Sequence, residues 1–206
     1  MPAAYFDNFP YVAYSLNETD GPNDFNWVTD IFRRVTPVAD LLKNKKMFYP
    51  YLIVEGETPE MIAHRVYGST KYHWVVNLIN NITDPLVDWP KNYANLVRFI
   101  VDTYGSVAGA ASGTHHYTMT ISKVDSLGNS SEETFIIDLT KYNTLTSPVP
   151  VVTTFSNGGT VTTTVSRAIV DNYNYEVDAN EAKRSIVLLK DTYLPQVVAQ
   201  LESQLE

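Results

Sequence analysis

The sequence predicts an α+β fold: a strand–helix–helix unit, an inserted β-hairpin subdomain and a C-terminal strand–helix element. Three observations favour this class. The run 48–54 is β-branched and aromatic, and two short segments with helical spacing follow it. Residues 114–168 are rich in threonine and alternate with period two. The chain has 206 residues, enough for one ordinary domain or two small ones.

Residues 1–46 are expected to form an extended arm followed by a short helix. The arm is rich in aromatic and turn-forming residues and has little periodicity, so it cannot form a core alone. We expect it to lie against its own domain or against a neighbour. Between 28 and 42 the apolar positions recur at roughly helical spacing, with a break or kink expected at Pro37.

Residues 47–104 carry the clearest pattern. After the strand, Thr58 is placed to cap a helix that has Pro59 in its first position, and Gly68 is placed to end it. A second helix is capped by Ser69 or Thr70 and ends at 80–81. Residues 84–88 are a candidate short strand, and a third helix is expected from near 90 to 101.

Residues 105–170 are predicted to be a linker and a β-hairpin insertion. The segment 105–113 consists of small residues and cannot bury a face, so it is interpreted as the linker. Strands are expected at 117–122 and 134–139, joined by a turn at 127–129. A second hairpin pairs 151–155 with 160–165 across Asn157-Gly158-Gly159, a strong turn signal.

Residues 171–206 are predicted to hold two short strands, 173–177 and 185–189, and a terminal helix. Asp191 or Thr192 is placed to cap this helix, and Pro195 is tolerated in its first turn. Its apolar stripe packs on the chain's own sheet or docks on a neighbouring subunit. The stripe consists of Leu194, Val197, Val198, Leu201 and Leu205.

The charge balance argues against nucleic acid and membranes as partners. The formal net charge is −8, whereas binding to phosphates needs a cationic surface. No apolar run approaches the ~20 residues that span a bilayer. The chain has no cysteine and no recognisable secretory signal, so synthesis and assembly in the cytoplasm are expected.

The residues give no support for catalysis, and we expect no enzyme, no metal and no cofactor. The four histidines lack zinc-site spacing, and no nucleophile elbow or phosphate-binding glycine loop occurs. Two of the carboxylates Glu55, Glu57 and Glu60 could act together in glycan cleavage. Their position at a turn and at the start of a helix, where they interact favourably with the helix dipole, explains them adequately.

Two stretches resemble known families. The residues Val54-x-Glu-Gly56-Glu-Thr58-Pro-Glu-x-Ile62-Ala63 resemble the LysM motif, in which a strand meets a Gly-Glu-Thr turn and a helix carrying Ile-Ala. The stretch from His64 through Tyr67-Gly68 and Trp74-Val75 to Asp84-Pro85 is similar to the LysM-like wedge proteins of T4-type phage baseplates. The segment 173–196 resembles sequences of such baseplate components. The resemblance does not extend to residues 114–168.

The resemblance implies a structural protein of the virion, located in the tail baseplate and joining adjacent wedges into a ring around the central hub. Its partners would be other wedge proteins and neighbouring wedges. The alternative is a peptidoglycan-binding LysM module, with a shallow groove between the turn at 56–58 and the exit at 80–85. The residues expected to bind partners are Tyr5, Phe6, Phe9 and Tyr11 in the arm and Tyr67, Asn80 and Asp84 in the module.

Overall fold

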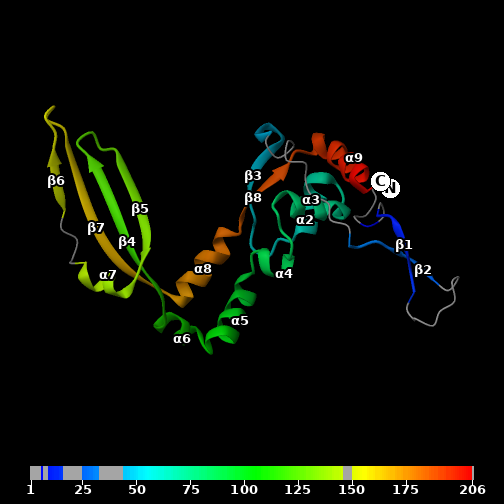
Figure 1. Ribbon diagram of the computed structural model, residues 1–206, viewed down its shortest axis with the longest axis horizontal. Coiled ribbons are helices and arrows are strands. Elements are labelled where there is room, and N and C mark those ends of the chain that lie inside the picture. Colours follow the sequence, from blue (N-terminus) through cyan, green and yellow to red (C-terminus); the bar gives the residue numbers. More distant parts are fainter. Residues whose placement is uncertain (1–5, 7–8, 16–24, 33–43, 146–149, 206) are drawn as a thin grey trace. The chain divides into compact units, whose positions relative to one another are not determined.

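The computed structural model describes residues 6, 9–15, 25–32, 44–145 and 150–205 (Figure 1). The chain divides into two compact units, Met1–Asn92 with Glu181–Glu206, and Tyr93–Asn180. The finer division into four segments stays a prediction. Tyr5 and most of the helix expected at 28–42 lie outside the described residues.

The first unit is built on a strand, two helices and a second strand that is distant in sequence. β3 (Phe48–Leu52) is followed by α2 (Pro59–Tyr67) and α3 (His73–Ile79). β3 pairs in antiparallel fashion with β8 (Ser185–Leu189), and Pro50 lies opposite Val187. Figure 1 shows these two strands side by side. The strands predicted at 48–54 and 185–189 are confirmed, apart from the last two residues of the first.

The caps predicted for the first helix of this unit are confirmed. The Thr58 hydroxyl accepts a hydrogen bond from the Met61 N–H at 3.4 Å, and Pro59 is the first helical residue of α2. Gly68 ends α2 with φ 74°, and its N–H donates to the His64 carbonyl. Ser69 caps the 3-10 turn Thr70–Tyr72 that leads into α3.

The strand predicted at 84–88 is wrong, because these residues form the short helix α4 (Pro85–Asp88). The Asp84 carboxylate accepts from the Leu86 N–H at 2.9 Å. The Asp88 carboxylate accepts from the backbone N–H groups of Thr83 and Asp84 at 3.1 and 3.0 Å. Acidic side chains thus satisfy the free N–H groups at the start of the helix and favour it over a strand.

The core of the first unit holds the terminal helix. The predicted capping of the terminal helix by Asp191 or Thr192 is wrong, because both lie inside a 3-10 turn, Asp191–Tyr193, that leads into α9 (Leu194–Leu205). Four residues of its apolar stripe are buried in a cluster with residues of α3, β8 and the arm, so the stripe packs on its own chain. A second cluster lies around α2. Its members are Ile53, Ile62, Ala63, Val76, Trp89, Ile186 and Leu188.

The arm forms a hairpin rather than a helix at its described end. β1 (Tyr11–Tyr14) pairs in antiparallel fashion with β2 (Asn26–Thr29). Val28, which the sequence placed at the start of a helix, is therefore in a strand opposite Val12. Its neighbours are β-branched or aromatic, and cross-strand pairing outweighs the helical spacing.

The helices of the second unit correct two further predictions. α5 (Tyr93–Tyr104) is the expected third helix. The predicted linker is wrong in part, because it contains α6 (Val107–Ser112), which the Ser106 hydroxyl caps by accepting from the Gly109 N–H at 2.9 Å. The strand predicted at 173–177 is wrong, because these residues lie in α8 (Asn172–Ala182). Its Tyr173 and Val177 pack on the buried cluster Leu96, Ile100 and Ala110.

The sheet of the second unit confirms both predicted hairpins and joins them. Its strands are β4 (Thr114–Asp125), β5 (Ser130–Ile137), β6 (Val151–Thr154) and β7 (Thr160–Asp171), in the order β5-β4-β7-β6. β5 ends earlier than predicted because the Asp138 carboxylate accepts from the Lys141 N–H at 2.7 Å and caps α7 (Leu139–Thr144). Within the described segments, none of the helices combines the length and apolarity needed to cross a bilayer.

Candidate partner-binding surfaces

The first candidate surface is the aromatic hairpin, defined here as residues 11–14 and 25–29. Tyr11 and Trp27 are 67% and 66% exposed, and on the other face Tyr14 is 55% exposed. The ring of Phe25 meets that of Trp27 edge-on, with centroids 5.8 Å apart. Apolar and aromatic side chains therefore lie open on both faces of the hairpin.

The base of this hairpin is fixed to the core of the first unit. Phe9 is 3% exposed and packs in the cluster that contains α9. The Asp30 N–H donates to the Pro10 carbonyl at 2.8 Å, which closes the hairpin at its base. The hairpin is thus held at one end, where its sequence enters the core.

The four arm residues predicted to bind partners have different environments. Phe6 is 52% exposed, and its ring lies 5.2 Å from that of Phe9. Tyr11 is exposed, Phe9 is buried, and Tyr5 lies outside the described residues. Trp27 was not among the predicted binding residues, because the residues that follow it, from Val28 on, were interpreted as a helix. The turn formers Gly21, Pro22 and Asn23 ahead of it were the available signal.

Tyr67 is partly buried in the module. Its ring packs against both core clusters of the first unit. Its hydroxyl donates to the Leu189 carbonyl at 3.1 Å, and burial raises the pKa of this phenol. These contacts occupy both the ring and the hydroxyl, and its role in partner binding stays a prediction.

Asn80 and Asp84 satisfy backbone groups of their own unit. The Asn80 side-chain amide donates to the Val187 carbonyl at 2.8 Å and accepts from the Val187 N–H at 2.9 Å. It therefore pairs with the outer edge of β8 as a neighbouring strand would. Asp84 caps α4. The structure places both at the exit of α3, and their binding role also stays a prediction.

The turn at 55–58 is closed by side chains of the first unit. Glu57 accepts from the Tyr51 hydroxyl at 2.7 Å and the Val54 N–H at 3.2 Å, and it forms an ion pair with Arg65. Burial raises the pKa of Glu57, but these hydrogen bonds and the guanidinium outweigh burial and hold the pKa below its usual value. The Trp89 indole N–H donates to the Glu57 carbonyl at 2.8 Å.

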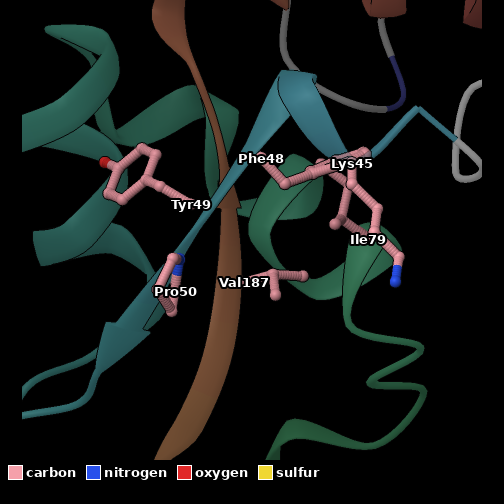
Figure 2. Close-up of a pocket in the computed structure, with 6 residues that line it drawn as sticks. All are labelled: Lys45, Phe48, Tyr49, Pro50, Ile79 and Val187. Atoms are coloured by element: carbon pink, nitrogen blue, oxygen red, sulfur yellow. The ribbon is translucent and has the colours of Figure 1, made fainter.

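The second candidate surface is a cavity of about 500 Å³ beside the β3–β8 sheet, called here the apolar cavity (Figure 2). Phe48, Pro50 and Val187 lie on the same face of the sheet, since Pro50 and Val187 are direct partners and Phe48 is two residues from Pro50. Figure 2 shows the Lys45 side chain beside Ile79. The lining residues are Lys45, Phe48, Tyr49, Pro50, Ile79 and Val187.

The side chains of the described segments offer no metal-binding group. No cluster of three or more His, Cys, Asp or Glu suited to a metal ion occurs there. In the second unit His115 stacks on Tyr175 with ring centroids 3.6 Å apart, and its Nδ1 lies 2.8 Å from that of His116. The surfaces that stand out are the aromatic hairpin and the apolar cavity, which suit contacts with other proteins.

Comparison with known proteins assigns the class: this is a structural protein of the phage tail baseplate, not an enzyme. Residues 1–201 match the family described as base plate wedge protein 53, and the chain belongs to that family. A curated relative is the baseplate wedge protein gp53 of Enterobacteria phage T4, 27% identical over 112 residues. That match covers 53% of this chain and 54% of the relative, so it spans about half of each.

The comparison confirms the predicted resemblance to baseplate wedge proteins and the predicted location in the virion. The LysM-like character of the module and the joining of adjacent wedges are finer statements that the comparison leaves open.

Proposed function

We propose that this chain joins adjacent baseplate wedges into a ring around the central hub, with other wedge proteins as its partners. Its family supports a place in the wedge. The observation that carries the joining role is the aromatic hairpin, which is fixed in the core at Phe9 and exposed at Tyr11 and Trp27.

A two-stranded hairpin with two exposed faces is marginally stable in water, so a hairpin of this kind gains stability when a partner covers it. Tyrosine and tryptophan are enriched among the residues that carry binding energy at protein interfaces. Because Phe9 and the Pro10 carbonyl hold its base, a contact made by Trp27 would transmit force to the core of the first unit.

In this proposal the first unit is a LysM-like platform for the hairpin. Two features support the assignment. The Gly-Glu-Thr-Pro turn connects β3 to the start of α2. The Ile62-Ala63 pair lies within α2. The order strand, helix, helix, strand is completed by β8, which pairs with β3 after a long insertion.

The test is ring assembly from wedges that were prepared without this chain. Adding the wild-type chain should produce rings that sediment faster and are visible by electron microscopy. We expect the double variant Tyr11→Ala, Trp27→Ala to lower the ring yield at limiting concentration by about tenfold or more, as loss of interface aromatics does elsewhere.

The matched control is Leu127→Ala, which removes an 87% exposed apolar side chain from the β4–β5 turn. This variant should assemble rings as the wild type does. If the double variant and the control both assemble rings normally, the aromatic hairpin does not join wedges.

A second candidate function, binding of peptidoglycan, is favoured by one observation. A cavity of about 310 Å³ lies at the exit of α3, one of the two sides of the predicted glycan groove, and none of its described lining residues comes from the turn at 56–58. Against this function, the ring and hydroxyl of Tyr67 are engaged in the interior. Cosedimentation with purified cell-wall sacculi in moderate salt, lost on Asp88→Ala, would support it. The cavity is lined by Asn80, Asn81, Ile82, Asp88, Lys183, Ser185 and Ile186.

A further inference from the structure

The arm that carries the aromatic hairpin is strongly acidic. Residues 1–32 contain no lysine or arginine. They contain five carboxylates, so aromatic side chains and negative charge occur together in this segment. The carboxylates are Asp7, Glu18, Asp20, Asp24 and Asp30.

The rim of the apolar cavity has the opposite charge, on a chain whose formal net charge is −8. Lys45 lines the cavity, and exposed Lys46 is its neighbour in sequence. The Lys190 amino group donates to the Lys46 carbonyl at 2.6 Å, which brings a third cation to this end of the sheet. Among the described residues Lys45 forms no ion pair. The cavity therefore combines apolar walls with unneutralised positive charge.

The aromatic hairpin does not fill the cavity of its own chain. The lining residues that the structure describes come from the segment 45–50, from α3 and from β8, and none of them belongs to the hairpin. Trp27 remains 66% exposed. The two surfaces of one chain are thus complementary in charge and in apolar character, and among the described residues neither covers the other.

We propose that the aromatic hairpin of one copy docks into the apolar cavity of the next copy, with Trp27 inserted between Phe48, Pro50 and Val187. The net negative charge of residues 1–32 then complements Lys45 and Lys46 of the receiving copy. This inference rests on the proposed function, since neighbouring wedges bring successive copies together. Such a head-to-tail contact uses two different surfaces, and repeated around a symmetry axis it closes a ring.

The edge of β3 indicates that side chains make this contact. The Lys190 N–H donates to the Met47 carbonyl, and the Ile53 N–H donates to the Arg184 carbonyl. In an antiparallel ladder with this register, the backbone groups of residues 48, 50 and 52 point to the free edge. Pro50 has no N–H to offer there, so addition of a further strand is disfavoured and the cavity is the available receptor.

The experiment uses the full chain and tests the two surfaces separately. By sedimentation, the wild type should self-associate with increasing concentration and less at high salt. Trp27→Ala on the hairpin and Lys45→Glu on the cavity rim should each weaken self-association by about tenfold or more. Lys46→Glu, which changes an exposed lysine outside the cavity lining, should weaken it less.

Mixing the two defective variants gives the decisive readout. The Lys45→Glu copy retains an intact hairpin and the Trp27→Ala copy an intact cavity, so a head-to-tail contact predicts a one-to-one dimer that grows no further. A wild-type chain that stays monomeric at every concentration, or variants that associate like the wild type, would overturn the inference.

Cross-linking can detect a contact between copies that is too weak to be seen by sedimentation. The chain has no cysteine, so single-cysteine variants report unambiguously. A short bis-maleimide should join Ala13→Cys, opposite Trp27 in the hairpin, to Lys46→Cys at the cavity rim far more than either forms homodimers, because both variants keep Trp27 and the cavity walls. Leu127→Cys should join neither. Equal cross-linking by Leu127→Cys would sink the proposal. Ring assembly from wedges is measured in a separate experiment. If Lys45→Glu forms rings normally, this contact between copies is rejected, but the proposed function of joining wedges is not.

Discussion

The two units of this chain achieve stability in different ways. In the first unit, side chains from β8 and α3 are fully buried, among them Val75, Leu188 and Leu189. In the second unit, the four-stranded sheet leaves most side chains half-exposed or exposed, with Ile136 at 75%, and Thr118 is its buried residue. A buried hydrophobic core stabilises the first unit, whereas backbone hydrogen bonds between long strands stabilise the sheet.

The difference shows which part of the molecule resembles an ordinary domain. The sheet has an apolar face with Met119, Ile121 and Val165, and Ile121 lies directly opposite Val165. These side chains are partly exposed, and the fully buried Ile100 of the second unit lies among its helices instead. Core substitutions should therefore act strongly in the first unit and weakly in the sheet.

The largest effect is expected from Leu188→Ala. Leu188 is 0% exposed, so the shorter alanine side chain leaves a cavity in the core. The free energy of unfolding of the first unit should fall by about 2–5 kcal/mol. Trp27, Trp74 and Trp89 all belong to the first unit, so denaturation followed by tryptophan fluorescence reports on it selectively.

The contrasting variant is Ile136→Ala in the sheet. Because Ile136 is exposed, hydrogen exchange of the second unit should show a change within about 0.5 kcal/mol. A loss as large as that of Leu188→Ala would mean that the sheet has a buried core after all, and the comparison would fail.

The next effect concerns Glu57 and pH. Its pKa is below the usual value in the folded state, so its contribution to stability is present above the unfolded-state pKa and is lost as pH falls through the folded pKa. Glu57→Gln should cost about 1–3 kcal/mol at neutral pH and should flatten the acid side of the stability curve. Glu60→Gln, at an exposed position in the first turn of α2, should change the free energy of unfolding at neutral pH by no more than about 0.5 kcal/mol. Identical acid profiles for the wild type and Glu57→Gln would contradict the prediction.

A glycine substitution should have the same modest effect in the two units. Gly68 and Gly128 have φ values of 74° and 87°, and a Cβ at either position would meet no atom within 4 Å. Alanine should therefore cost only the backbone penalty, about 1 kcal/mol at each site. Thermal melts of the two variants check this. A much larger loss at Gly68 would show that the first unit amplifies local strain and the sheet does not.

Elements with local caps could be predicted from the sequence. α2 begins at Pro59 after Thr58 and ends at Gly68 because short-range hydrogen bonds and a left-handed residue define both ends. The β6–β7 hairpin was equally predictable, since its Asn-Gly-Gly turn is a local signal. In these cases the residues that determine the structure are neighbours in sequence.

The errors arose where a cap was overlooked or two periods coincided. Tyr173, Tyr175 and Val177 alternate like a strand, but Tyr173 and Val177 are also four residues apart, and that helical spacing packs them on Ile100. The Asp171 carboxylate accepts from the Asn174 N–H at 2.8 Å at the start of α8. Ser106 gave the corresponding cap signal ahead of α6.

The candidate surfaces were only partly predictable for a different reason. Tyr11 was identified because aromatic residues in an arm without periodicity suggest a binding role, and it is exposed. The apolar cavity requires β8 beside β3, and no local pattern indicates which distant strand pairs with which. The part played by Asn80 at the edge of β8 depends on the same long-range pairing.

The pairing of β3 with β8 also sets the order of events during synthesis. Leu52 pairs with Ser185, so the ribosome must complete the whole second unit before the closing strand of the first unit exists. At roughly 5–20 residues per second this interval is on the order of ten seconds. During that time the apolar faces of α2 and α3 lack β8 and α9, while the second unit is free to fold. The first unit can therefore complete its core only after β8 and α9 have been made.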